Sequence, residues 1–91
     1  MNRVIYKYPF SPLDGICEIR TGDVPIVRHV GQQADRWFAW IEHDARTGLK
    51  DTAVLMIIGT GQPFSRTEPP IRHVATITDG PFVWHVHQVI R

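Results

Sequence analysis

Two histidines stand one residue apart near the end of the chain, at His85 and His87. On a β-strand this spacing places both imidazoles on one face, so a single strand can offer two ligands to a metal ion. A metal site needs a third ligand, and the side chains that could supply one stand at no diagnostic spacing: His29, His43, His73, Glu18 and Glu42. We therefore expect no metal and no cofactor, with two ordinary strand histidines or a small-molecule contact as the alternatives.

A glycine-rich segment, Gly59-Thr60-Gly61-Gln62, follows an apolar stretch. Successive glycines let backbone N–H groups form an anion-binding concavity. The lysine of a phosphate-binding P-loop is missing and no helical pattern follows, which excludes a Walker motif. The segment predicts either a ligand loop or a wide turn whose glycines serve backbone geometry. In the first case Arg66 and Arg72 would hold phosphates, because arginine favours bidentate contacts with them.

Nucleophilic and acid–base catalysis find little support. Cys17 falls in a predicted strand, where a small buried hydrophobic residue is the better interpretation. Ser11 and Ser65 lack the motif of a nucleophile elbow, and the carboxylates are too scattered to name a pair. We expect no catalytic residues and no enzymatic activity.

The aromatic residues carry more information. In the segment 36–42, Trp37 lies on one face of the predicted strand and Trp40 on the other, so both faces are apolar. Such a strand is central in a sheet, contacts a partner chain, or stacks on a flat ligand. Trp37, Trp40 and Trp84 are therefore the candidates for stacking on a base.

Frequent proline and glycine cut the chain into short pieces, which is typical of an all-β protein. The apolar and β-branched pieces between them predict strands over 3–8, 15–20, 25–30, 36–42, 51–58, 70–78 and 82–90. The segments 25–30 and 36–42 look like a hairpin with a longer loop. In 70–78, Ile71, His73, Ala75 and Ile77 share one face by strict alternation. We expect a small antiparallel β-sandwich or partly open barrel of about six or seven strands with little helix.

Length and charge narrow the function classes. The chain has 91 residues, 43% of them hydrophobic, and ten basic against nine acidic side chains give a formal charge of +1. This predicts one globular domain over residues 1–91 and argues against generic nucleic-acid binding. One cysteine excludes an internal disulfide, and no segment has the length and apolar character of a signal peptide or membrane span. We expect no contact with a membrane.

Three segments resemble a family of small phage and prophage proteins known as a domain of unknown function: 5–10 (Ile-Tyr-Lys-Tyr-Pro-Phe), 58–63 (Ile-Gly-Thr-Gly-Gln-Pro) and 79–86 (Asp-Gly-Pro-Phe-Val-Trp-His-Val). The resemblance implies a phage accessory protein acting in the cytoplasm of the bacterial host. It brings no catalytic residue with it. Small β-rich phage proteins include sponges that sequester nucleotide signals of bacterial immunity, and this chain is compatible with that class by analogy.

The first functional hypothesis is therefore a homo-oligomer that sequesters a nucleotide-derived immune signal in a pocket between subunits. Its ligand-binding residues would be Trp37, Trp40, Gly59, Thr60, Gly61, Gln62, Arg66, Arg72, Trp84, His85 and His87. The alternatives are a protein-interaction module that inhibits a host enzyme through its flat aromatic surface, and a metal-dependent nucleotide hydrolase that uses His85 and His87. For the oligomer, segments 36–41 and 82–90 are the expected contacts, the latter as a free sheet edge.

Overall fold

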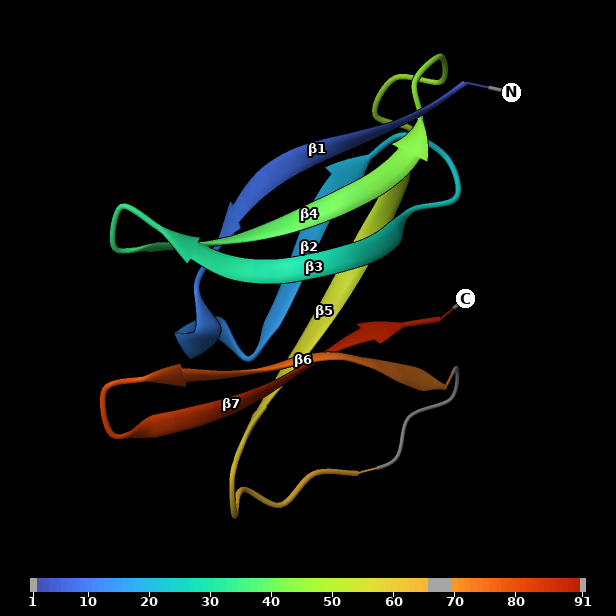
Figure 1. The fold of residues 1–91 in the computed structure, drawn as a ribbon. Helices are drawn as coiled ribbons and strands as arrows, with labels where there is room; N and C mark the ends of the chain where they lie inside the picture. The colour runs from blue at the N-terminus through green and yellow to red at the C-terminus, as the bar shows by residue number, and fades with distance from the viewer. Residues whose placement is uncertain (1, 66–69, 91) are drawn as a thin grey trace.

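The chain folds into two antiparallel β-sheets, as the sequence predicts (Figure 1). The computed structural model describes residues 2–65 and 70–90. Within those residues the elements in chain order are β1 (Arg3–Phe10), the short 3-10 turn η1 (Pro12–Asp14), β2 (Ile16–Thr21), β3 (Ile26–Gln33), β4 (Arg36–Asp44), β5 (Asp51–Gly59), β6 (Ile71–Asp79) and β7 (Phe82–Val89). No helix in this part of the chain is long and apolar enough to cross a membrane.

The two sheets differ in size and lie one over the other. Sheet A has three strands in the order β1-β4-β3, and sheet B has four in the order β2-β5-β7-β6. In Figure 1 sheet A lies in front of β2 and β5, while β6 and β7 continue sheet B below it. Strand β3 of sheet A contacts β6 of sheet B. The result is an open sandwich rather than a closed barrel.

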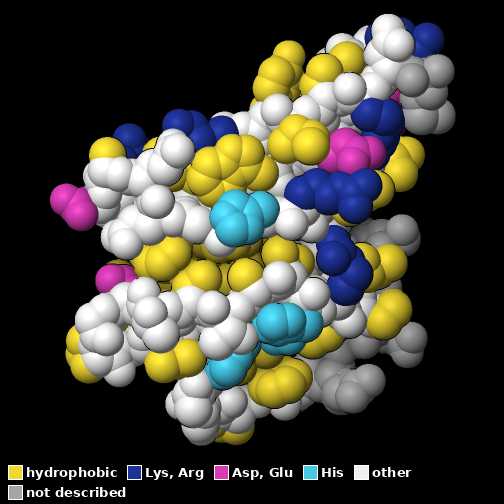
Figure 2. Space-filling model, viewed as in Figure 1, with side chains coloured by type: hydrophobic (Ala, Val, Ile, Leu, Met, Phe, Trp, Pro, Cys, Tyr) yellow, Lys and Arg dark blue, Asp and Glu magenta, His cyan; other side chains and the backbone are white. Residues whose placement is uncertain are grey.

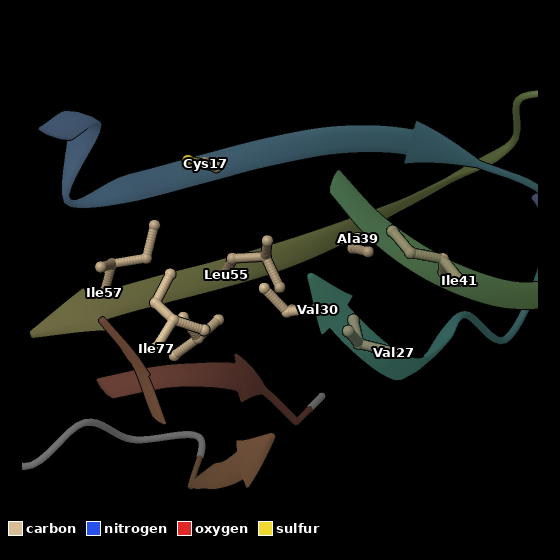
Figure 3. Close-up of a cluster of buried hydrophobic side chains, with 10 residues drawn as sticks. Cys17, Val27, Val30, Ala39, Ile41, Leu55, Ile57 and Ile77 are labelled. Carbon is tan, nitrogen blue, oxygen red and sulfur yellow. The ribbon is translucent and has the colours of Figure 1, made fainter. Parts of the chain in front are cut away.

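The hydrophobic core forms where the inner faces of the two sheets meet. Sheet A contributes residues such as Val27 and Ile41, and sheet B contributes Leu55 and Val86, all almost completely buried. Figure 3 shows Val27 of β3 and Ile41 of β4 on one side of this core and Leu55 of β5 on the other. Each large aliphatic residue buried in this way contributes about 1.5–3 kcal/mol of transfer free energy.

Strand β4 is central in sheet A and apolar on both faces, as expected. Its inner residues Trp37, Ala39 and Ile41 face the core, whereas Phe38 and Trp40 point to the outside. None of the described strands covers these two rings. The side chain of Lys7 lies 4.5 Å from the centre of the Phe38 ring, so part of the cover comes from a long polar side chain of the same sheet.

The hairpin between β3 and β4 differs from the expected longer loop. Pairing continues from Gly31 to Gln33, and the turn consists only of Ala34 and Asp35. Both turn residues have positive φ, 49° and 63°, which is the geometry of the tight turns that connect antiparallel strands. Polar residues that suggested a loop are therefore the solvent-exposed end of two longer strands.

The prediction of strict alternation along β6 is also wrong. The register against β7 shifts between His73 and Ala75, which marks a β-bulge at Val74. Because of this extra residue, Ala75 and Ile77 face the core while His73 shares the outer face with Thr76. Strand β6 contains neither glycine nor proline, so no residue type in it marks the bulge.

The last strand is not the free edge that its terminal position suggested. Strand β7 pairs with β5 on one side and with β6 on the other, so it is an inner strand of sheet B. The connection between β5 and β6 is long enough to leave room for a strand between them. Strand β7 takes that place, so it is not an edge of the sheet. The sheet edges belong to β1, β3, β2 and β6.

Candidate functional site

A cavity of about 420 Å³ lies where β5 ends and β7 begins. It is lined by Gly59, Thr60, Pro81, Phe82, Val83 and Trp84. The volume falls in the range of small-molecule sites in proteins, about 300–1,000 Å³. All six lining residues come from the segments 58–63 and 79–86, two of the three that carry the family resemblance.

Two aromatic rings form one wall of this cavity. Phe82 and Trp84 are stacked, with 5.7 Å between ring centroids and 25° between planes. Phe82 is 55% exposed, so much of its side chain remains accessible to a ligand. Opposite them, Gly59 allows close approach of the indole, because a Cβ at this position would lie 3.3 Å from Cζ3 of Trp84. Glycine at 59 thus keeps space for the aromatic wall.

The indole N–H of Trp84 points away from Gly59. The ring edge formed by Cε3 and Cζ3 faces that glycine, and Nε1 lies on the opposite side of an indole. This Nε1 is buried and has no hydrogen-bond partner among the described residues. The wall therefore offers a ligand an apolar surface for stacking and no donor from Trp84.

The glycine-rich segment forms a tight turn rather than an open anion cradle. The amide of Gln62 donates to the carbonyl of Gly59 at 3.0 Å, and the amide of Gly59 donates to Oε1 of Gln62 at 2.9 Å. The amide of Thr60 donates to the carbonyl of Val83 at 3.1 Å. Gly61, with φ of 83°, supplies the left-handed conformation that such a turn needs. Three backbone donors of the turn are thus already used within the protein.

A hydrogen-bond chain leads from the cavity across the outer face of sheet B. Oγ1 of Thr60 lies 2.8 Å from Nε2 of His85, whose Nδ1 lies 3.1 Å from Oγ1 of Thr76. The same hydroxyl lies 3.0 Å from Nε2 of His73. His85 therefore fixes the Thr60 hydroxyl at the rim, where it can donate to or accept from a polar atom of a ligand.

His87 lies beside this chain of hydrogen bonds, but its side chain is in a different environment. Burial lowers the pKa of His87, and the positive charge that His73 can carry lowers it further. Its Nδ1 is buried without a partner in the described part of the chain, and its ring packs edge-to-face against His73 at 5.4 Å. The folded protein therefore favours the neutral form of His87.

This environment predicts a pH-dependent stability. An unfolded histidine has a pKa of about 6.5, so below that pH the unfolded chain binds more protons than the folded one. The stabilisation is complete above about pH 6.5 and is lost as the pH falls through the lower pKa of the folded state. Urea unfolding at several pH values above 5 should show this loss, and His87→Gln should reduce it. An equally steep loss in His87→Gln would contradict the assignment, and His29→Gln on sheet A serves as the control.

Arg72 belongs to a different place in the fold. A second cavity, of about 330 Å³, lies at the opposite end of β5 and β7, and Arg72, Asp51 and Gln88 are among its lining residues. One guanidinium nitrogen of Arg72 donates to the carbonyl of Val27 at 3.0 Å and to Oε1 of Gln88 at 2.9 Å. Arg72 thus joins sheet B to β3, and it does not meet Trp84 or the Gly59 turn.

The remaining tryptophans also lie away from the cavity lined by Phe82 and Trp84, here called the aromatic cavity. Trp37 packs against the core from inside sheet A. Trp40 lies on the outer face, with its ring 5.3 Å from that of His29. Figure 2 shows this outer face, on which Lys and Arg side chains flank hydrophobic ones. Glu42 there accepts hydrogen bonds from Arg3 and Arg28, both at 2.8 Å, and these contacts lower its pKa.

The structure thus brings together five of the residues expected to bind ligand: Gly59 and Thr60 in the cavity wall, Trp84 opposite them, and Gly61 and Gln62 in the adjoining turn. His85 touches the cavity through Thr60, and Arg66 lies outside the described residues. The residues expected to bind ligand did not include Phe82, although its spacing of two from Trp84 places both rings on one strand face. Within residues 2–65 and 70–90, no three His, Cys, Asp or Glu side chains are grouped to hold a metal ion.

Comparison with known proteins yields a family but no described function. No curated protein and no solved structure matches the chain. A family model described as a domain of unknown function, DUF7352, matches residues 1–91. The match spans both segments that line the aromatic cavity, as well as the strands that hold them. The chain belongs to the DUF7352 family.

Proposed function

We propose that this protein is a binding protein without enzymatic activity that sequesters a nucleotide-type ligand, with the base held in the cavity between the Gly59 turn and the Phe82–Trp84 wall. The observation that carries the proposal is the pair of stacked rings lining a cavity of about 420 Å³, with Phe82 more than half exposed. A nucleobase is flat and stacks on aromatic side chains with about 1–3 kcal/mol per base.

The polar groups at the rim fit the edge of such a base. The Thr60 hydroxyl, held by His85, can pair with a ring nitrogen or a carbonyl. No cation among residues 2–65 and 70–90 lines the cavity, so the proposal assigns the main share of affinity to the base rather than to phosphate. It also departs from the expectation of a pocket between subunits, since the cavity lies within one chain.

The biological setting follows from the family resemblance. The segments 58–63 and 79–86 carry that resemblance and also supply every residue of the cavity wall. We propose on this basis a phage accessory protein that acts in the cytoplasm of the bacterial host and removes an immune signal by binding it. An anti-defence role of this kind requires tight binding and no turnover.

Isothermal titration calorimetry tests the proposal with a panel of adenine and guanine nucleotides, cyclic dinucleotides and ADP-ribose derivatives. At least one should bind, and Phe82→Ala should weaken that binding about tenfold to a hundredfold because a stacking surface is lost. Trp40→Ala, which removes a ring from the other sheet, should leave it unchanged. The bound compound should be recovered intact after incubation. Absence of binding across the panel, or equal affinity of Phe82→Ala, would reject the site.

A second candidate function is a protein-interaction module that inhibits a host enzyme. The outer face of sheet A favours it, because Phe38 and Trp40 lie there and no other described strand covers them. Arg36 and Lys7 lie beside the Phe38 ring, which fits an acidic surface on the partner. This function predicts a stoichiometric protein partner that Trp40→Ala loses while its fold persists.

A further inference from the structure

Strand β2 is the described edge strand with the least protection against pairing with another chain, because its outward charges are one glutamate and one arginine. Edges β3 and β6 contact each other, and β1 contains Lys7 and Pro9, residue types that discourage edge pairing. Strand β2 contains neither lysine nor proline, and it pairs with β5 on one side only (Figure 1). No hydrogen bond from the described residues outside β5 reaches its backbone. One row of backbone donors and acceptors is therefore open.

The outward side chains of β2 alternate in charge. Glu18 and Arg20 are both exposed and are two residues apart, so they stand on the same outer face. Between them, Ile19 points inward with Cys17 and is partly buried against the core. An antiparallel partner strand of the same sequence would complement this pattern.

We propose that β2 pairs with β2 of a second copy of the chain, antiparallel about a two-fold axis at Ile19. Glu18 then lies opposite Arg20 of the second copy, and the same pair recurs on the other side of the axis. The two copies of sheet B become one continuous sheet of eight strands, four from each copy. Each pair of opposite charges on neighbouring strands stabilises the strand pairing by about 0.2–1 kcal/mol.

The register follows from the charges and from the two faces of the sheet. An axis that falls between two residues would set an inward side chain opposite an outward one, which a continuous sandwich face does not allow. An axis at Glu18 would place that residue opposite itself, and an axis at Arg20 would do the same with two guanidinium groups. The axis at Ile19 avoids both repulsions.

Exposed apolar residues at the two ends of β2 add to the contact. Ile16, 61% exposed, begins the strand, and Leu49, also 61% exposed, lies near its end because Arg20 donates a hydrogen bond to the Leu49 carbonyl. In an antiparallel pair the beginning of one β2 faces the end of the other. Ile16 of one copy therefore lies beside the end of β2 of the second copy, opposite Gly22.

Charge reversal tests this surface. Sedimentation velocity over a range of concentrations should show a dimer for the unmodified chain. Glu18→Arg and Arg20→Glu should each weaken the dimer by about tenfold or more, because two attractive pairs become repulsive. The double variant Glu18→Arg/Arg20→Glu should restore it, and an equimolar mixture of the two single variants should form heterodimers. Both side chains are exposed, so circular dichroism should report an unchanged fold.

Two results would overturn the proposal. A monomer up to millimolar concentration would exclude the dimer, and a dimer equally stable in all variants would place its contact elsewhere. Because β2 contributes no residue to the aromatic cavity, failure here would leave the nucleotide proposal intact. Loss of nucleotide binding in Phe82→Ala would likewise leave the dimer unchanged.

Discussion

Replacing Gln88 with leucine should lower the free energy of unfolding by about 3 kcal/mol, because the buried amide of Val27 and the part-buried carbonyl of Pro25 would lose their partners. Gln88 is 5% exposed and stands on β7 at the junction of the two sheets. Its Oε1 accepts a hydrogen bond from the amide of Val27, and its Nε2 donates to the carbonyl of Pro25, both at 2.9 Å. Arg72 donates to the same Oε1.

Leucine has a similar size, so the loss would not come from a cavity. It would come from the unpaired amide of Val27 and the unpaired carbonyl of Pro25, each of which costs about 1–3 kcal/mol when buried. Urea denaturation followed by circular dichroism measures the effect. Gln32→Leu, at an exposed position on β3, is the matched control and should change stability by less than about 0.5 kcal/mol. Equal stability of the two variants would show that Gln88 does not join the sheets.

The second large effect concerns Gly22, where alanine should cost about 3 kcal/mol through overpacking. Gly22 is buried just after β2. A Cβ added there would clash with the carbonyl oxygen of Asp44 and would lie 2.6 Å from Nδ1 of His43. Since one clashing atom belongs to the backbone, the end of β4 would have to move.

That movement would break a local hydrogen-bond network. His43 donates from Nδ1 to the Asp44 carbonyl at 3.1 Å and accepts at Nε2 from the Tyr8 hydroxyl at 2.8 Å. The thermal unfolding midpoint of Gly22→Ala should therefore fall well below that of Gly48→Ala. Gly48 has positive φ but open space around it, so its variant bears only a backbone cost of about 1 kcal/mol. Similar midpoints for both variants would argue against the clash.

Local patterns were sufficient to predict most strands of this fold. The pattern of segment 36–42 predicts both a strand and its two apolar faces, because Trp37 and Trp40 fall on opposite sides by simple alternation. The bulge at Val74 escaped prediction since it depends on how β6 meets β7, and no local residue type marks it. The inner position of β7 depends on long-range pairing with β5, which the order of segments along the chain does not reveal.

The difference between local residue patterns and long-range strand pairing also applies to the candidate site. The sequence predicts separate roles for Gly59 and Trp84, the first through its backbone freedom and the second through its ring. Only the register of β5 against β7, in which Gly59 lies opposite Trp84, shows that they form one wall. Arg72 was grouped with them by residue type alone, and its place at the other end of β7 separates it. Gln88 gave no signal, because a single glutamine in a strand is usually an exposed polar residue.

The strand pairings also bear on the order in which the chain can fold. Only β3–β4 and β6–β7 join neighbours in sequence, whereas Arg3 of β1 lies opposite Asp44 of β4 and Thr21 of β2 lies opposite Asp51 of β5. Closing such long loops costs entropy before any contact is gained, so distant pairings form slowly. The two hairpins can form first and independently, with β1 and β2 added once β4 and β5 are in place. On the ribosome, β1 and β2 must therefore wait for β4 and β5, and the wall made by Phe82 and Trp84 is completed only after the six preceding strands have been synthesised.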